Sequence, residues 1–393
     1  MKILHLFSNW KWTGPAEHAL SLALALKQEG HTVAFACAAP PPDAPDSIAH
    51  RAGLAGIRPV TRFRLNKHFN PAQNLSDIPR LRRFIKKEKF DIVHTHLPND
   101  HFLAGMALRA TFGRTALIRT CYDGDGVRRG PRTRLLFSFM TDGLITISER
   151  TKKQIAERHY LSKTKLWKLD VPVDLKRFDP NRAPDNRAGF GLAPEAIIGG
   201  IVARVQRHRR FEVLLEAIRI ILNDFPGFKF MIIGRGTHIE QIAVKPSQNM
   251  GIRTNLIFTG YKNEDFVETL ACLNFKVFLM PGSDGSCRAV REAMALGIPV
   301  IAANRGMLSE IVEHGKEGLI IEDTPENLAA AMLYLVEHPE IRQTMGRNAY
   351  EKSRRHFNPD LHAKKVTALY EKTLKVKFSK KWYSLIKNRR YKK

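Results

Sequence analysis

The chain has 393 residues, of which 44% are hydrophobic, and it carries 64 Lys and Arg against 38 Asp and Glu. Its length exceeds that of one ordinary hydrophobic core and predicts two domains, and its composition is that of a soluble globular protein without biased repeats. The formal net charge of +26 favours polyanionic surfaces, which means nucleic acid or anionic lipid.

Targeting and membrane-spanning segments are not expected. Residues 1–7 form a short strand-like run that ends at polar residues, unlike a signal peptide. No stretch approaches the ~18 consecutive apolar residues of a spanning helix. The four cysteines, Cys37, Cys121, Cys272 and Cys287, are scattered without metal-type spacing. We therefore expect a cytoplasmic chain with reduced thiols.

Residues 1–180 alternate strand-like runs with helical patterns, which predicts a doubly wound parallel sheet. The runs are KILHLFS, TVAFACA, DIVHTHLP, LIRTCYD, GLITIS and LWKLDVP. The polar segment 181–193 is the predicted hinge. A second alternation follows, in the runs IIGGIVA, FKFMIIG, NLIFTGY, FKVFLMP, PVIAA and GLIIE. We therefore expect two domains, 1–180 and 181–360, followed by a helix and basic tail in 361–393.

Loops of the first half hold candidate binding residues. Gly14 follows the first strand and suits either a phosphate-facing loop or an ordinary helix entrance with proline near its start. His94 and His96 alternate at a strand end and point the same way. Two such histidines could bind a metal, but no third ligand is evident nearby, and a core role is the alternative. Asp123 and Asp125 form an Asp-x-Asp pair, for which turn formation is the favoured explanation.

Loops of the second half hold cations and glycines. Arg204 and Arg209 follow its first strand. Fixed cations there suit an anionic ligand, and a solvated basic loop is the alternative. Gly234, in a Gly-Arg-Gly turn after the next strand, is a weak signal by itself.

The stretch 275–322 contains a strand, a loop and a helix twice over. Its first loop is rich in glycine and holds Asp284 and Ser286, and the helix that follows carries Arg288 and Glu292 four residues apart. In parallel sheets both loops lie at the carboxyl ends of strands, where ligands bind, and both helix N-termini offer N–H groups to an anion.

This stretch resembles the donor-binding core of family 4 glycosyltransferases, which are retaining enzymes of the GT-B fold. The resemblance rests on two acids separated by seven residues, Asp284 and Glu292, and on the run EAMALGIPV. It is weaker in the first half. The family usually has Glu in place of Asp284, and a Gly-aromatic-Gly turn where this chain has residues 285–288.

The resemblance implies two Rossmann-like domains that face a cleft, with a C-terminal helix that crosses back to the first domain. It also implies retention, a nucleotide-sugar co-substrate, no cofactor and no metal. The catalytic residues it implies are Arg204, Arg209, Asp284 and Glu292. The donor-binding residues are Gly14, His96, Gly234, Ser286, Arg288, Gly306 and Glu310. Asp123 matches a position on the acceptor side.

Arg288 also stands out by its charge. A cation in the first turn of a helix lies at the positive end of the helix dipole, so an anion is expected near it. Asp284 and Glu292 are candidate partners within the chain. We expect Arg288 to face the donor pocket and to contact a donor phosphate or an acidic or hydroxyl-rich sugar.

The C-terminal segment 375–393 holds nine Lys and Arg, no acid, and several aromatic residues. It is either a solvated basic tail or a segment that lies on an anionic membrane surface. The features together predict a peripheral glycosyltransferase at the cytoplasmic membrane face, with a cell-envelope glycan or lipid-linked acceptor. A non-catalytic nucleic-acid-binding protein is one alternative, which charge alone favours and no recognisable binding module supports. A sugar-binding relative that lost its activity through the changes at Asp284 and Arg288 is another.

Overall fold

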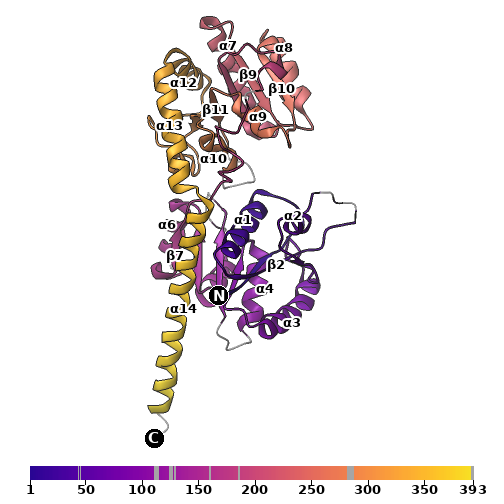
Figure 1. Cartoon of the computed structure of the whole chain (residues 1–393), viewed down its shortest axis with the longest axis vertical. Helices are drawn as coiled ribbons and strands as arrows, with labels where there is room; N and C mark the ends of the chain where they lie inside the picture. Colours follow the sequence, from indigo (N-terminus) through magenta and orange to yellow (C-terminus); the bar gives the residue numbers. More distant parts are fainter. Residues whose placement is uncertain are drawn as a thin grey trace. The chain divides into compact units, whose positions relative to one another are not determined.

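The fold is known from a computed structural model of the chain. The structure describes residues 1–42, 44, 46–109, 115–123, 127, 130–158, 161–184, 186–280 and 287–390, and for residues 163 and 380–390 it describes the backbone. The chain divides into two compact units (Figure 1). The first unit comprises Met1–Pro172 and Pro359–Lys393, and the second comprises Val173–Asn358.

The first unit is built, in its described residues, on a parallel sheet of seven strands in the order β3-β2-β1-β4-β5-β6-β7. The strands are β1 (Lys2–Phe7), β2 (Thr32–Cys37), β3 (Pro59–Val60), β4 (Ile92–Thr95), β5 (Ala116–Cys121), β6 (Gly143–Thr146) and β7 (Leu166–Lys168). The order reverses between β1 and β4, where His5 pairs with His94. Such a reversal opens a crevice at the carboxyl ends of the two strands, where α/β sheets bind ligands.

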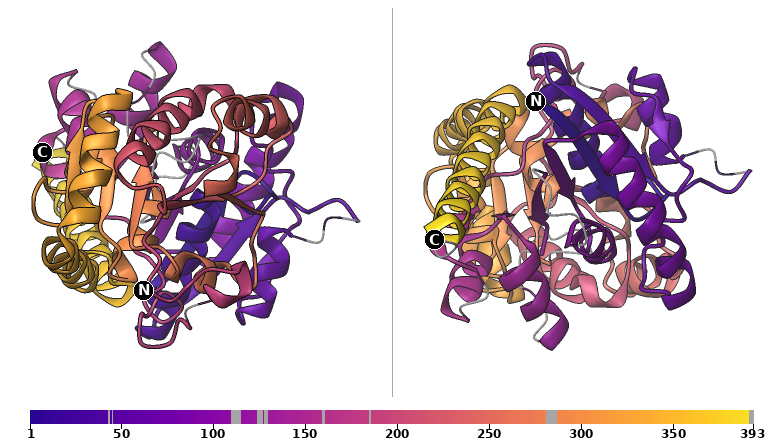
Figure 2. Two further views of the ribbon diagram at one scale, coloured as in Figure 1. Left: turned by 90° about the horizontal axis from the view of Figure 1, so that it is seen from above. Right: turned by 90° about the horizontal axis from the view of Figure 1, so that it is seen from below.

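Helices cover both faces of this sheet. They are α1 (Gly14–Gln28), α2 (Ile48–Leu54), α3 (Pro71–Glu88), α4 (Pro98–Arg109), α5 (Pro131–Leu135), the π-helical turn η1 (Leu136–Met140), α6 (Glu149–Glu157), the 3-10 turn η2 (Lys163–Lys165) and α14 (Pro359–Arg390). On one face, Leu4 packs in a cluster with Leu81 of α3. On the other, Ile3 packs with Leu26 of α1 and Tyr370 of α14. Figure 2 shows the yellow α14 and the purple α3 on opposite sides of this sheet.

Helix α14 returns the chain to the first unit, as the sequence predicted. Ala363, Val366 and Tyr370 are buried against the face that α1 also covers. Farther along, Lys377 Nζ donates to the backbone oxygen of Thr115 at 2.7 Å and to Asp142 Oδ2 at 2.6 Å. The helix continues to Arg390, so the basic segment that begins at residue 375 extends from a packed helix.

The second unit holds, among its described residues, a parallel sheet of six strands in the order β10-β9-β8-β11-β12-β13. They are β8 (Ile198–Val202), β9 (Lys229–Ile233), β10 (Leu256–Gly260), β11 (Phe275–Phe278), β12 (Val300–Ala303) and β13 (Gly318–Ile321). This order reverses between β8 and β11. Every strand-like run predicted in this half is a strand, and the predicted α/β class with two doubly wound sheets is confirmed.

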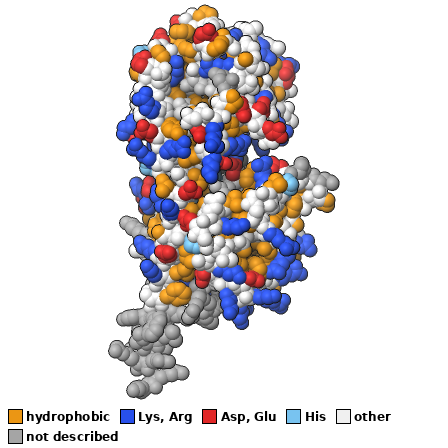
Figure 3. Space-filling model, viewed as in Figure 1, with side chains coloured by type: hydrophobic (Ala, Val, Ile, Leu, Met, Phe, Trp, Pro, Cys, Tyr) orange, Lys and Arg blue, Asp and Glu red, His pale blue; other side chains and the backbone are white. Residues whose placement is uncertain are grey.

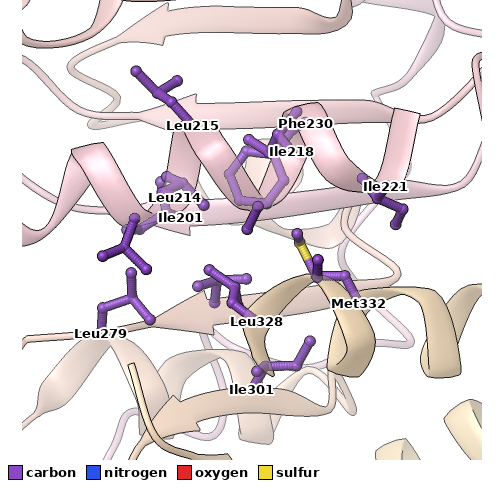
Figure 4. Close-up of a cluster of buried hydrophobic side chains, with 14 of the residues drawn as sticks. Ile201, Leu214, Leu215, Ile218, Ile221, Phe230, Leu279, Ile301, Leu328 and Met332 are labelled. Carbon is purple, nitrogen blue, oxygen red and sulfur yellow. The ribbon is translucent and has the colours of Figure 1, made fainter. Parts of the chain in front are cut away.

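Helices of the second unit pack an apolar core onto its sheet. They are the 3-10 turns η3 (Ala188–Phe190), η4 (Arg207–Arg209) and η6 (Arg253–Asn255), the π-helical turn η5 (Glu240–Val244), α7 (Phe211–Asp224), α8 (Lys245–Asn249), α9 (Phe266–Ala271), α10 (Arg288–Ala295), α11 (Leu308–Ile311), α12 (Pro325–Glu337) and α13 (Pro339–His356). Figure 4 shows Leu214 and Ile218 of α7 above Leu328 and Met332 of α12, with Ile301 of β12 below. This core fixes the strand ends from which the site loops leave.

The segment between the units differs from the predicted hinge. The division falls after Pro172, and segment 181–193 belongs to the second unit. Arg187 explains the difference, because its guanidinium donates to the backbone oxygen of Cys272 at 3.1 Å and to Asn274 Oδ1 at 3.2 Å. A polar segment can thus be fastened by hydrogen bonds and need not be a linker.

Among the described residues, none of the helices combines the length and the apolar character that crossing a bilayer requires.

Candidate active site

Two loops of the second unit meet where its strand order reverses. Arg209 ends η4 in the loop after β8, and its guanidinium donates to the backbone oxygen of Met280, just past β11, at 2.9 Å. Arg204 lies in the same loop and is exposed. Within the part of the chain that the structure describes, Arg204 makes no hydrogen bond or ion pair. Arg209 is therefore held by the protein, whereas Arg204 is available to a ligand.

Helix α10 brings together the predicted residues Arg288 and Glu292. Arg288 Nε lies 3.3 Å from Glu292 Oε1, and the Glu292 side chain is 5% exposed. An anion therefore does lie beside the first-turn cation, as its place on the helix dipole requires. The helix starts after Cys287, whose φ of +50° is in the left-handed region that side chains other than glycine rarely adopt. Asp284, Ser286 and the rest of segment 281–286 lie outside the described residues.

Lys276 is a charged residue of this site that the sequence analysis did not single out. It lies in the middle of β11, is fully buried, and donates through Nζ to the backbone oxygen of Ala289 in the first turn of α10. Burial lowers its pKa to about 7, while the nearby Glu292 carboxylate raises the pKa and Arg288 lowers it further. A lysine inside an apolar run such as FKVFLM is the signal that could have found it.

Two glycines past the end of β9 are required because their backbone packs closely on the backbone past the end of β8. A Cβ on Gly234 would lie 2.1 Å from the Ala203 oxygen, and one on Gly236 would lie 2.1 Å from the Val205 oxygen. Gly234 also has a φ of +148°. The Gly-Arg-Gly turn therefore supports the loop that carries Arg204, whether or not it touches a ligand.

Asp323 joins three loops at the carboxyl edge of the same sheet. It accepts from Arg305 at 2.7 Å, just past β12, and lies 3.0 Å from Nε of Arg210 in the loop after β8. Burial alone would raise the pKa of Asp323, but the two guanidinium groups lower it below its ordinary value. Gly306 follows Arg305 with a φ of +58°, and Glu310 lies on α11. The predicted loop after β12 is thus held at this edge.

In the first unit, Asp100 fastens the loop that leads to Gly14. Its carboxylate accepts from the backbone N–H of Ser8, just past β1, at 2.9 Å and from that of Leu97 at 2.8 Å. Burial raises the pKa of Asp100 to about 7, and the hydrogen bonds from Ser8 and Leu97 act in the opposite direction. The loops after β1 and β4 are therefore fixed to each other at the strand reversal. Gly14 is the first residue of α1.

His96 lies in a buried cluster with His5 and His94. His5 Nδ1 is 3.0 Å from His96 Nε2, and the ring centres of His94 and His96 are 4.6 Å apart. Burial lowers the pKa of all three imidazoles, that of His5 to about 3, so the cluster is neutral at physiological pH. His5, the third histidine of the cluster, could not be predicted, because the sequence alone does not show that β1 and β4 are neighbours.

Candidate ligand atoms of the three histidines lie within 4.8 Å of one another, which is the spacing of a metal site. The hydrogen bonds do not favour such a site. Both nitrogens of His94 are engaged, by Tyr370 at 2.5 Å and Thr120 at 2.8 Å, and His96 Nδ1 is 3.0 Å from the Tyr122 hydroxyl. A metal would need lone pairs that these contacts occupy. The arrangement suits a hydrogen-bonded cluster that orients His96.

Asp123 lies just past β5 and is exposed. Its Oδ2 accepts from the thiol of Cys121 at 3.2 Å, and its backbone oxygen accepts from Thr151 at 2.6 Å. Asp125 lies outside the described residues. These contacts fix the backbone at Asp123 and leave its side chain at the surface, which suits either a turn or a ligand contact.

Two protein families have models that match this chain. The model described as Glycosyl transferases group 1 matches residues 183–352, and the model described as Glycosyltransferase Family 4 matches residues 12–177. The matched regions together include the candidate residues of both units.

Three similar proteins illustrate these matches. UDP-Gal:alpha-D-GlcNAc-diphosphoundecaprenol alpha-1,3-galactosyltransferase of Escherichia coli is 24% identical over 320 residues, which are 78% of this chain and 81% of the relative. A crystal structure of a glycosyltransferase from Rickettsia africae ESF-5 has a TM-score of 0.81 at 18% identity, over 95% of this chain and 98% of the other. A crystal structure of an Anabaena protein in complex with UDP-glucose has a TM-score of 0.74 at 16% identity, over 94% of this chain and 98% of the other.

Proposed function

This chain belongs to the family 4 glycosyltransferases and has the GT-B fold, and from that premise we propose that it transfers a sugar from a nucleotide-sugar donor with retention of the anomeric configuration. The observation that carries the proposal is the pair of cations after β8. Arg209 is held at the end of β11, and Arg204 is exposed in the same loop at the strand reversal. Ligands of α/β sheets bind at such reversals.

The two arginines suit a diphosphate leaving group. Negative charge develops on the diphosphate as the glycosidic bond breaks, and cations that are already in place stabilise this charge without reorganisation. Arg209 is preorganised by its bond to Met280. The similarity to a protein that binds UDP-glucose supports a nucleoside diphosphate at this position.

Glu292 and Asp284 are the proposed acidic partners of the donor. Glu292 would accept hydrogen bonds from ribose hydroxyls, and Asp284 from hydroxyls of the sugar. Arg288 already neutralises Glu292 in the free protein, at 3.3 Å, and it would be shared with a donor phosphate or sugar when donor is bound. We propose front-face attack by the acceptor within an ion pair, without a metal or other cofactor.

The proposed acceptor is a lipid-linked or cell-envelope glycan at the cytoplasmic face of a membrane. The Escherichia coli relative, whose name specifies a diphosphoundecaprenol-linked acceptor, supports this class of substrate. The excess of 64 Lys and Arg over 38 Asp and Glu supports a peripheral position on anionic lipid.

A screen of nucleotide-sugars with the purified full chain tests the proposal. We expect slow hydrolysis of one donor, with release of its nucleoside diphosphate, in the presence of EDTA. Proton NMR of the freshly released sugar should show the anomer of the donor. Donor binding without hydrolysis or transfer would contradict the proposed enzymatic activity and identify a sugar-binding relative. Release of the opposite anomer would contradict retention.

A further inference from the structure

Helix α3 presents a row of cations to solvent. The exposed basic residues of its second half and C-cap are Arg80, Arg82, Arg83, Lys86, Lys87 and Lys89. Its two acids do not balance them. Asp77 is buried and accepts from the backbone N–H of Leu65 at 2.9 Å, and Glu88 accepts from Lys2 Nζ at 2.8 Å. Figure 3 shows Lys and Arg side chains gathered over this part of the first unit.

A surface pocket of about 270 Å³ lies on this row of cations. It is lined by Arg62, Arg80, Arg83 and Lys87, together with Phe63 and Phe84. Arg62 Cζ lies 4.3 Å from the centre of the Phe84 ring and 5.3 Å from that of Phe63, and both rings are buried. Stacking therefore holds the guanidinium of Arg62 in place. In the described chain, none of the four cations of this pocket makes a hydrogen bond or an ion pair.

Helix stability does not account for the row. Lys86 and Lys87 lie in the last turn, where cations interact favourably with the helix dipole. Arg80 and Arg83 lie earlier. Arg80 is three residues before Arg83, and Arg83 is four residues before Lys87, so the three cations lie along one side of the helix. Like charges three or four residues apart destabilise a helix. An anion in the pocket would remove this repulsion.

We propose that the α3 pocket binds the phosphate group of an anionic phospholipid and thereby docks the first unit on a membrane surface. The inference rests on the proposed function, because a lipid-linked acceptor is presented at a bilayer. Guanidinium groups match phosphate oxygens in a bidentate geometry, and Arg62 is already oriented. The flanking Arg82 and Lys86 contact neighbouring headgroups on the same surface.

A bilayer explains the pocket better than a nucleic acid does. Proteins that bind single strands combine cations with exposed aromatic rings on which bases stack. Phe63 and Phe84 are 3% and 9% exposed, and Arg62 covers them, so they offer no such platform. The exposed cations outside the pocket, Arg82, Lys86 and Lys89, lie along one side of α3, which suits a flat anionic surface.

Vesicle binding by the full chain tests this inference. The variant Arg80→Gln with Arg83→Gln is compared with a control, Lys245→Gln with Arg347→Gln, which removes the same charge from exposed sites on the second unit. Vesicles of phosphatidylcholine with and without phosphatidylglycerol are the probe. Each cation near an anionic surface contributes about fivefold to binding, so the α3 variant should bind phosphatidylglycerol vesicles roughly 30-fold more weakly, and the control should bind like the parent.

Other outcomes overturn the inference. Equal losses of vesicle affinity in the α3 variant and the control would show a general effect of net charge. No loss of affinity in either variant would show that the pocket does not contribute to membrane binding. A loss of affinity for a short DNA duplex, with vesicle binding intact, would assign the pocket to nucleic acid. Release from vesicles by inorganic phosphate at constant ionic strength would assign it to a free anion. UDP binding is measured in parallel, because it reports on the proposed function and not on the pocket.

Discussion

The guanidinium of Arg209 donates a hydrogen bond of 2.9 Å to the backbone oxygen of Met280, and so joins the loop after β8 to the end of β11. A residue that the sequence predicts as a ligand contact therefore also holds the backbone from which segment 281–286 leaves. Arg204, in the same loop, has no such role among the described residues. The two arginines should respond differently to substitution.

Arg204→Ala should lower the affinity for UDP, or for whichever nucleoside diphosphate the screen identifies, by about 10-fold or more. A charge-assisted hydrogen bond contributes roughly 1.5–3 kcal/mol. The thermal stability of the Arg204→Ala variant should match that of the parent. Arg209→Ala should lower both affinity and stability, because the Met280 oxygen also loses its donor. Calorimetric titration measures the affinity, and thermal unfolding measures the stability. Turnover equal to that of the parent in both variants would show that neither arginine belongs to the donor site.

Glu292→Gln should destabilise the protein as well as weaken donor binding. The Glu292 side chain is 5% exposed and lies beside Arg288, and its charge raises the pKa of the buried Lys276. Because Arg288 is 37% exposed, solvent screens the pair, and the loss should be about 1 kcal/mol, below the cost of breaking a fully buried pair. Urea unfolding measures this loss. Parental stability together with parental donor affinity would show that Glu292 neither balances the buried lysine nor binds donor.

Lys276→Met should remove part of the pH dependence of stability. Burial lowers the pKa of Lys276 to about 7, below the value of ~10.4 expected in the unfolded chain. The unfolded state then binds more protons between these values, so the contribution of Lys276 to stability is present above pH ~10 and is lost as the pH falls through about 7. The parent should gain stability relative to Lys276→Met as the pH rises across this window. Parallel stability profiles would contradict the lowered pKa.

Deletion of residues 379–393 should weaken binding to phosphatidylglycerol vesicles, and added salt should weaken it further. The deletion leaves intact the packed part of α14, which includes Tyr370 and the contact of Lys377 with Asp142. Thermal unfolding should therefore be unchanged. Co-sedimentation measures the binding, and parental binding by the truncated chain would exclude a contribution from the tail.

The strands of both sheets, apart from the two-residue β3, could be predicted because β-branched and apolar residues form runs bounded by glycine, proline and polar residues. The candidate loops followed from the strands, because loops at the carboxyl ends of parallel strands form the site. What could not be predicted depends on neighbours that are distant in the chain. His5 joins His94 and His96 only because β1 pairs with β4. Asp323 meets Arg210 only because the loops after β8 and β13 reach the same edge.

Arg288 has one of the two acidic partners that its position in the helix predicts. The sequence placed it in the first turn of a helix and required an anion beside it, and Glu292 Oε1 lies 3.3 Å from its Nε. The side chain is still 37% exposed, so it can contact a ligand without leaving Glu292. We expect the arginine to hold Glu292 in the free protein and to contact the donor when donor is bound.

Substitution of Arg288 separates these two contributions. Arg288→Lys keeps the charge beside Glu292 but loses the planar fork, so it should keep most of the stability and lose donor affinity. Arg288→Ala should lose both, with stability falling by up to about 1 kcal/mol because the pair is partly exposed to solvent. Calorimetric titration with the donor and urea unfolding of the same samples measure the two quantities. If both variants bind donor like the parent while Arg288→Ala alone is less stable, Arg288 is a partner of Glu292 and does not contact the donor.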